Sequence, residues 1–562
     1  PVAALFDLLV SVRLGRAAPI EEFDNETVAA SPDLPAARKL CRELNALHFP
    51  VAFPEVFLRE RPGFDCLLGN PPWEEVTVEE LRFWSGHFPG VQALAQGRQR
   101  AALTEFREQR PDLVDELEAE KDKAKAMREI LIAGPYDGMG TGDPELYKAF
   151  TWRLWNLVRE NGAVGVVLPR SALTAAGSAP WREAVFDGGG FADVTILLNK
   201  SRWVFADVHP QYSVGLVSIR RGLSHAGQVQ VRGPYSNLSL FFTGMEATPA
   251  QFDAADFRTW LSGAAFPSLA GPESGLLFAK FRKHPRFDDP DAHTWQARPV
   301  RELDATNDKK EMIVEPESED GLWPVYTGAS FDLWASDTGT YFAWADPAHI
   351  VELLSARRSR ARGNKRSAFN AMSAEWLDDP ETLPVRNLRL AFRDITNRTN
   401  TRTVIAALVP PDRPLTNKAP YLVWARGDSR DQAYLLGVLA SRVLDWYARR
   451  VVELNMNYHV LNAFPIPALE VESSLRQMIE CVSGRLAAPD ERYAGWAAEV
   501  GVSFGPLEQE EKEQLIVRLD ALVAKAYGLD TADLTHIFET FHEGWDYGPT
   551  LKATLAAFEG LT

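Results

Sequence analysis

The sequence predicts an α/β fold: a doubly wound sheet, followed by an α+β region and a helical module. Three observations predict it. Short apolar runs alternate with amphipathic stretches up to about residue 222. From about residue 225 to 467, short alternating segments are rich in Pro, Gly and Trp. Beyond residue 470 the sequence is again typical of helices, most clearly at 514–529. We therefore expect domains at 1–235, 236–470 and 471–562.

The elements of the first region follow from hydrophobic periodicity. Residues 1–60 are expected to be mostly helical and to end in a short buried connection at 48–57. FDCLLG at 64–69 is an apolar run of strand length, which predicts a buried parallel strand. The charged stretch at 74–140 predicts a helical insertion, and 146–162 predicts an amphipathic helix that stops at its final Gly.

Three more strands are expected at 163–169, 193–199 and 212–220. Strands that alternate with helices at this spacing predict a doubly wound sheet. The Gly188–Gly190 run lies between two of these strands, and we interpret it as a turn.

Composition limits the functional classes. The chain of 562 residues carries 60 basic and 77 acidic residues, a net charge of −17, which taken alone disfavours nucleic acid. Local basic patches, however, decide contact with DNA. Three scattered cysteines and no apolar run of membrane-spanning length indicate a cytoplasmic protein without disulfides. The histidines show no metal-ligand spacing, so no metal site is expected.

Asn70-Pro71-Pro72-Trp73 follows the first expected strand, where open α/β sheets bind ligands. The exocyclic amine of a base is a poor nucleophile because its lone pair is delocalised into the ring. Two acceptors on its hydrogens, the Asn70 side-chain oxygen and the Pro71 carbonyl, would favour a more tetrahedral nitrogen. The prolines make the turn rigid, and Trp73 offers a face for stacking.

These residues carry a family resemblance. FDCLLGNPPW resembles motif IV of the amino-methyltransferases, in the form typical of adenine-N6 enzymes. Residues 146–173 resemble the following helix and strand of gamma-type adenine methylases, and 203–222 resemble motif VIII. Residues 454–467 resemble the end of the recognition region in large type IIG restriction–modification methylases and in phage-defence methylases of the BREX and DISARM type. Residues 389–410 and 519–541 are similar to the same families.

The resemblance implies a methyltransferase domain built on a Rossmann-like sheet. The reaction it implies is transfer of a methyl group from S-adenosylmethionine to adenine N6 in double-stranded DNA, with the base flipped out. Asn70, Pro71 and Pro72 would form the catalytic turn. Trp73 and Phe205 would stack on the two faces of the base, with Trp203 a weaker candidate for the second face. Tyr147 would lie near the cofactor.

One part of the family pattern is absent from the sequence. A complete enzyme carries a glycine loop well before the Asn-Pro-Pro motif, where the backbone approaches the cofactor. Only 69 residues precede Asn70, and none form such a loop. We therefore expect the sheet to lack its first three strands, and cofactor binding to need a missing N-terminal portion.

Two basic segments are candidates for contact with DNA phosphates and base edges. The first contributes Arg357, Arg358, Arg360, Arg362, Lys365 and Arg366. The second contributes Arg389, Arg393, Arg398 and Arg402, with Asn397 and Asn400 between them. A solvated charge run, or an internal ion pair such as Arg393 with Asp394, is the structural alternative.

Two other functions stay open. A methylase could act on another amine: cytosine N4, RNA or a protein glutamine. The chain could also be a non-catalytic DNA-binding or scaffold subunit of a phage-defence complex, with other subunits as partners. The missing glycine loop favours this second alternative.

Overall fold

The computed structural model describes residues 2–20, 22–210, 212–222, 227–269, 271–361, 363–365, 367–396, 400–452, 455–542 and 545–561. The chain divides into two compact units, Pro1–Phe266 and Pro267–Thr562. The boundary lies beyond the expected position at 235, because the segment that follows completes the first sheet. The larger part of the expected recognition region, from Pro267 on, lies in the second unit together with the expected C-terminal module.

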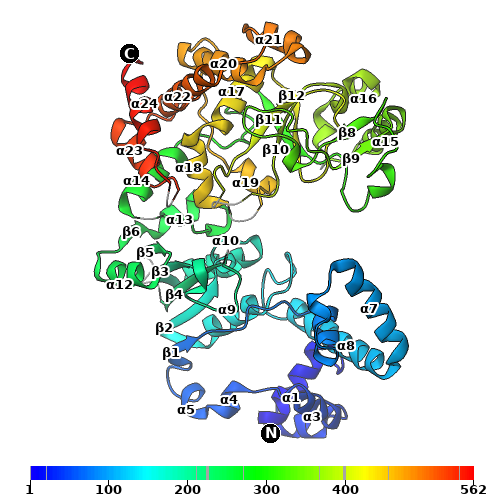
Figure 1. Cartoon of the computed structure of the whole chain (residues 1–562). Helices are drawn as coiled ribbons and strands as arrows, with labels where there is room; N and C mark the ends of the chain where they lie inside the picture. The colour runs from blue at the N-terminus through cyan, green and yellow to red at the C-terminus, as the bar shows by residue number, and fades with distance from the viewer. Residues whose placement is uncertain are drawn as a thin grey trace. The chain divides into compact units, whose positions relative to one another are not determined.

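A six-stranded mixed sheet forms the centre of the first unit (Figure 1). Its order is β1-β2-β4-β3-β5-β6, in which only β1 with β2 and β3 with β5 are parallel pairs. The strands are β1 Phe64–Gly69, β2 Val158–Pro169, β3 Gly189–Leu198, β4 Ser213–Arg221, β5 Gln228–Tyr235 and β6 Ala250–Asp253. The α/β class and the four expected strands are confirmed. The sheet is mixed because β4 returns between β2 and β3, antiparallel to both.

Helices α9 (Leu146–Leu157), α10 (Ser171–Thr174), α11 (Ala179–Gly188), α12 (Leu238–Glu246) and α13 (Ala254–Trp260) accompany the sheet. Helix α9 ends earlier than its sequence predicts, because Val158 already pairs with Phe64 of β1. The expected turn at Gly188–Gly190 is instead a direct helix-to-strand junction. A Cβ on Gly189 would lie 2.1 Å from the backbone oxygen of Arg220, so glycine is required there.

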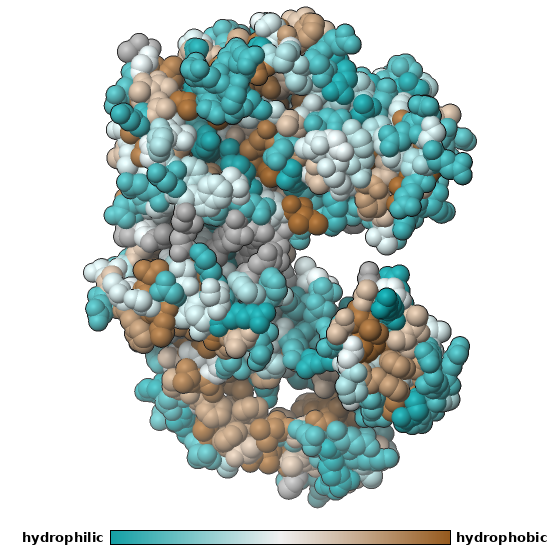
Figure 2. Space-filling model, in the orientation of Figure 1, coloured by the Kyte–Doolittle hydropathy of each residue, from teal (hydrophilic) through white to brown (hydrophobic). Residues whose placement is uncertain are grey.

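Strand β1 is parallel, as expected, but it is not buried. It forms one edge of the sheet, and the side chain of Leu68 is 88% exposed. Hydrophobic side chains lie on the surface around β1 and α4 (Figure 2). An exposed edge strand with apolar side chains is a template for another strand.

The first 60 residues are mostly helical, as predicted. They form α1 Val2–Arg13, α2 Asn25–Ala30, α3 Leu34–Glu43, α4 Phe49–Ala52 and α5 Pro54–Phe57. The connection at 48–57 is partly to fully exposed rather than buried, and it contains the two short helices. The insertion is helical as well: α6 Glu80–His87, α7 Gln96–Gln109 and α8 Pro111–Ala133 pack around Trp84, Leu113 and Leu117.

The second unit contains an antiparallel sheet of order β11-β10-β12-β7 and the strand pair β8-β9. These strands are β7 Gln296–Val300, β8 Trp323–Val325, β9 Ala343–Ala345, β10 Arg389–Phe392, β11 Ala406–Val409 and β12 Tyr421–Arg426. The expected α+β character of this region is thus present in the structure.

Helices make up the rest of the second unit: α14 Pro272–Arg282, α15 Pro347–Arg360, α16 Ala374–Asp378, α17 Ser429–Ala440, α18 Arg442–Val451, α19 Tyr458–Asn462, α20 Ser474–Ala487, α21 Ala494–Val500, α22 Gln509–Ala526, α23 Thr531–Glu539 and α24 Gly548–Glu559. Helix α17 is buried over most of its surface, because it packs against α20, α21, α22 and β11. None of the helices in the described residues is long and apolar enough to cross a membrane.

Candidate active site

The Asn70–Trp73 turn begins where β1 ends. Asn70 is exposed, Pro71 is buried, Pro72 is exposed and Trp73 is half-buried. The indole Nε1 of Trp73 donates to the backbone oxygen of Val167 in β2, at 3.4 Å. The turn is thereby fixed at the carboxyl ends of the two parallel strands β1 and β2, with the polar Asn70 side chain left available to a ligand.

A buried asparagine fixes the loop that carries Phe205. Asn199 follows β3 directly and is fully buried. Its Nδ2 donates to the backbone oxygens of Phe205 and Val208, at 3.0 and 2.9 Å. Its Oδ1 accepts from the backbone nitrogens of Val204 and Phe205, at 3.1 and 2.9 Å. Sequence analysis did not identify Asn199; an Asn directly after a buried strand and before an aromatic loop was the available signal.

Asn199→Ala should release this loop. Two backbone N–H groups and two carbonyls would lose their partners, so we expect the free energy of unfolding to fall by about 2 kcal/mol. Amide hydrogen exchange should accelerate at 204–208 in particular. The control is Asn237→Ala, which removes an exposed helix cap, with an expected loss of about 1 kcal/mol. Unchanged exchange in the loop would contradict the anchoring role of Asn199.

Trp73 and Phe205 lie in direct contact. Their ring centroids are 5.6 Å apart and their planes meet at 88°, an edge-to-face arrangement. A base held between two parallel rings needs about 7 Å between them, twice the usual stacking distance. The clamp therefore stays a prediction that requires one ring to rotate. Trp203 precedes Phe205 in the same loop, and its Nε1 donates to the backbone oxygen of Leu198 at 2.6 Å.

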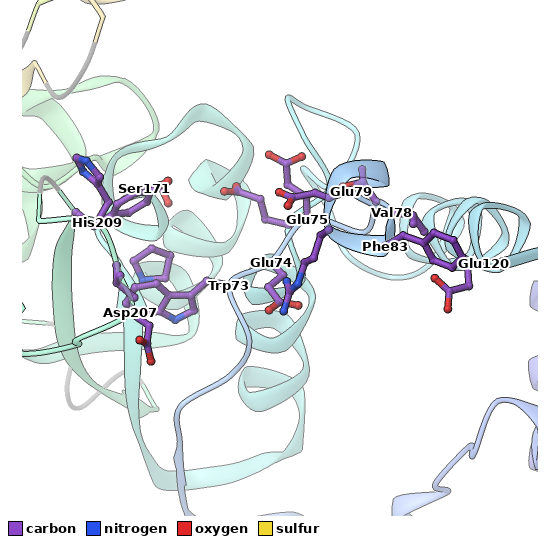
Figure 3. Close-up of a pocket in the computed structure, with 16 residues that line it drawn as sticks. Trp73, Glu74, Glu75, Val78, Glu79, Phe83, Glu120, Ser171, Asp207 and His209 are labelled. Carbon is purple, nitrogen blue, oxygen red and sulfur yellow. The ribbon is translucent and has the colours of Figure 1, made fainter. Parts of the chain in front are cut away.

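A pocket of about 880 Å³ opens beside Trp73 (Figure 3). Trp73, Ser171, Asp207 and His209 come from the end of the sheet, and Val78, Phe83 and Glu120 come from the helical insertion. The pocket thus lies between the Asn70–Trp73 turn and the insertion. A pocket of this size accommodates a nucleoside-sized ligand.

Carboxylates dominate the charge of the pocket. They belong to Glu74, Glu75, Glu79, Glu120, Glu145 and Asp207, against the guanidinium of Arg82. Such a lining repels a phosphodiester, whereas an uncharged base can enter. DNA phosphates would therefore have to be bound outside this pocket.

Tyr147 lies behind the pocket rather than in it. It is fully buried in the first turn of α9, and the wall in front of it contains Glu145 and Ser171. Burial, together with the negative charge of Glu145, raises the pKa of the Tyr147 phenol well above its usual value. The hydroxyl is thus neutral at physiological pH, and direct contact with a cofactor would require rearrangement of the wall.

The described residues around this pocket fit S-adenosylmethionine, the cofactor that the resemblance implies, only in part. The acidic lining suits the positively charged sulfonium of the cofactor. A cofactor of this size also needs a close backbone approach, however, and the glycine run at 188–190 is packed against β4. The described residues therefore do not form a complete cofactor site.

No protein-family model and no curated protein sequence matches the chain. Among solved structures, it is similar to the type IIL restriction-modification enzyme MmeI in complex with DNA, at 13% identity and a TM-score of 0.40 over 85% of this chain and 56% of that one. It is also similar to the type IIG restriction endonuclease BpuSI, at 13% identity and a TM-score of 0.27 over 77% and 51%. A third is a nuclease-deletion mutant of the type ISP restriction-modification enzyme LlaGI in complex with a DNA substrate mimic, at 8% identity and a TM-score of 0.35 over 81% and 43%. The chain spans about half the length of the structures it matches.

The arginines predicted to contact DNA differ in burial and in their partners. Arg358 and Arg389 are 4% and 3% exposed. Arg358 donates to Thr382 Oγ1 and to the oxygen of Asp379, and Arg389 pairs with buried Glu302 at 2.8 Å. For these two the prediction is corrected: their guanidinium groups are hydrogen-bonded inside the protein, Arg358 to neutral oxygens and Arg389 to the carboxylate of Glu302.

Three more of these arginines are engaged with carboxylates. Arg357 pairs with Asp308 at 2.7 Å, Arg402 with Asp445 at 2.9 Å, and Arg393 with Asp332 at 3.4 Å. The alternative pair of Arg393 with Asp394 is not the one found. Arg360 and Lys365 are exposed, as a DNA contact requires, and so is Asn400. Arg362, Arg366, Asn397 and Arg398 lie outside the described residues.

A groove of about 680 Å³ in the second unit adjoins the first basic segment. Arg298, Arg301 and Tyr458 line it, together with Ala361 and Asn462. Arg301 lies over the Tyr458 ring, 5.4 Å from its centroid. Arg298 and Arg301 carry no recognisable sequence signal, because they are isolated charges in β7 and directly after it, without a basic run around them.

Proposed function

We propose that this chain contributes the target-base site and the recognition region of a site-specific DNA methyltransferase. It would transfer a methyl group from S-adenosylmethionine to adenine N6, within a restriction–modification or phage-defence system. The observation that carries the proposal is the Asn70–Trp73 turn at the carboxyl end of β1, in contact with the Phe205 loop and open to a pocket.

The residues of the turn have separate roles in this proposal. The Asn70 side-chain oxygen and the Pro71 carbonyl accept hydrogen bonds from the adenine amine and orient its nitrogen. Pro72 keeps the turn rigid, so that the acceptors need no reorganisation. Trp73 stacks on one face of the flipped base, and Phe205 stacks on the other after rotating from its present contact.

The methyl donor would be held largely by further polypeptide. The unpaired edge of β1, with Leu68 exposed on it, supports this part of the proposal. A cofactor-binding portion that adds a strand next to β1 would extend the sheet and cover this apolar surface.

The second unit would bind the DNA backbone through exposed cations. Changing Arg360 and Lys365 together to Ala should weaken binding to any duplex. The slope of log affinity against log salt should become shallower by about 2, because each phosphate contact contributes about 0.9. The matched control is Lys552→Ala, an exposed lysine of α24. An unchanged salt slope in the double variant would show that neither Arg360 nor Lys365 contacts DNA phosphates.

The deciding experiment measures transfer of labelled methyl groups from S-adenosylmethionine to duplex DNA by the full-length protein, followed by nucleoside analysis. N6-methyladenine is the expected product. In parallel, a duplex with fluorescent 2-aminopurine at the target position should brighten on binding, and Trp73→Ala should weaken that signal. If the product is N4-methylcytosine instead, the target amine is that of cytosine and not that of adenine.

The scaffold function has one observation in its favour: the described residues do not complete a cofactor site. It predicts DNA binding without methyl transfer, even when the protein is supplied with its natural partner subunits. A folded protein that binds duplex DNA but transfers no methyl group under those conditions would establish the scaffold role.

A further inference from the structure

The N-terminal helices bring three potential metal ligands together. Asp7 lies in α1, Cys41 in α3, and His48 directly precedes α4. One ligand atom from each of them lies within 4.8 Å of the others. His48 Nε2 is 2.8 Å from Asp7 Oδ1, and Cys41 Sγ is 3.8 Å from the backbone oxygen of Asp7. The expectation of no metal site rested on sequence spacing, which cannot detect ligands 34 and 41 residues apart.

The ligand types select the ion. A thiolate and an imidazole favour a borderline-soft ion such as Zn²⁺ over Mg²⁺ or Ca²⁺, which prefer oxygen alone. Zinc binds sulfur at about 2.3 Å and nitrogen or oxygen at about 2.1 Å, so its ligands lie about 3.5 Å from one another. The three side chains are therefore at a separation that small adjustments convert into a zinc site.

The surroundings give the site an entrance and a fixed imidazole. The side chains of Asp7 and His48 are 15% and 13% exposed, so an ion can enter and water can complete the coordination. The His48 ring stacks on Phe6, with centroids 5.5 Å apart and planes at 24°. Cys41 is buried, so its thiol is protected from oxidants in bulk solvent.

The helical layer around these residues has a small core, formed by Ala4, Leu8, Val28, Leu34 and Ala37. Two of these five residues are alanines, which contribute little apolar area. A core of this size stabilises a helical layer only weakly. Small proteins with such limited cores often add a structural metal or a disulfide.

We propose that Asp7, Cys41 and His48 bind one Zn²⁺ ion, which cross-links α1 and α3 to the segment that begins α4. Three ligands from three elements would hold the layer that precedes β1, with water in the remaining position. It is independent of the proposed methyl transfer, because the pocket beside Trp73 shares none of these residues.

The test measures metal binding directly on the full chain. After removal of chelators, we expect one zinc ion per chain by mass spectrometry. Cobalt substitution should produce a sulfur-to-cobalt charge-transfer band. Cys41→Ser should abolish this band. It should also weaken zinc affinity by more than roughly 100-fold, because loss of a residue that only supports a ligand already costs up to about that much. Cys66→Ser and Cys481→Ser, at exposed cysteines, should leave both signals unchanged.

Folding is checked separately, because a ligand variant could unfold the layer. Chelation of the wild-type protein should lower the melting temperature, and added zinc should restore it. In Cys41→Ala, a conservative change for a buried cysteine, the melting temperature should no longer respond to zinc. Zinc binding that persists in a folded Cys41→Ser protein, or a wild-type chain that binds no zinc, would overturn the proposal and leave Asp7 and His48 as a hydrogen-bonded pair.

Discussion

Asp445→Ala should destabilise the second unit by about 4 kcal/mol, a large part of the 5–15 kcal/mol that typically separates folded from unfolded states. Asp445 lies in α18 and is fully buried. Its carboxylate accepts from Arg402 Nε at 2.9 Å and from the backbone nitrogens of Thr403 and Val404, at 2.9 and 2.7 Å. It also lies 3.5 Å from Arg449 Nε. Alanine would leave these groups buried without their acceptor.

Two controls separate the buried cluster from ordinary surface pairing. Asp445→Asn keeps an acceptor oxygen of the same shape and loses the charge, so a smaller loss is expected. Asp288→Ala removes a partly exposed partner of Arg286, for which we expect a change between about 0 and 1 kcal/mol. Urea unfolding measures the free energy of unfolding of all three variants, and hydrogen exchange reports the local stability of α17 and α18. An effect of Asp445→Ala as small as that of Asp288→Ala would show that water reaches the cluster.

Buried ion pairs of this kind explain why the proposed DNA contacts were harder to predict than the fold. Arg389 and Arg402 were assigned to DNA because their segment is basic. Their carboxylate partners Glu302 and Asp445 lie 87 and 43 residues away, so the local sequence does not predict these ion pairs. The spacing of charges in a sequence does not show which of them are paired over long range. Among the described candidates, Arg360 and Lys365 remain as exposed surface cations.

Local sequence sufficed for most of the strands of the first sheet. The apolar run at 64–69 coincides with β1. A short apolar run that ends at Asn-Pro-Pro is too short for a typical helix and therefore predicts a strand. The exposure of β1 and the end of α9 could not be predicted, because both depend on what pairs with a strand. Tyr147 illustrates the same limit at the site: its position in the chain resembled a cofactor contact, whereas packing placed it behind the pocket wall.

For the chemical step, Asn70→Ala carries the largest expected effect. Loss of one preorganised hydrogen-bonding group at a reacting centre lowers kcat by about 100- to 1,000-fold. Stability should change by less than about 0.5 kcal/mol, because the Asn70 side chain is exposed. Affinity for DNA should also persist, since the proposed phosphate contacts, Arg360 and Lys365, lie in the second unit. Single-turnover methyl transfer with the full-length protein measures the rate separately from product release.

Asn70→Asp is the matched variant, because it retains an acceptor oxygen at the same position. If Asn70 acts by accepting a hydrogen bond from the amine, Asp should restore part of the activity that Ala loses. If Asn70 merely shapes the turn between β1 and Pro71, both variants should lose activity together with the Trp73 contact to Val167, which tryptophan fluorescence would report. Full activity in Asn70→Ala would reject the turn as the catalytic element, because the Pro71 carbonyl alone supplies one acceptor for an amine that presents two hydrogens.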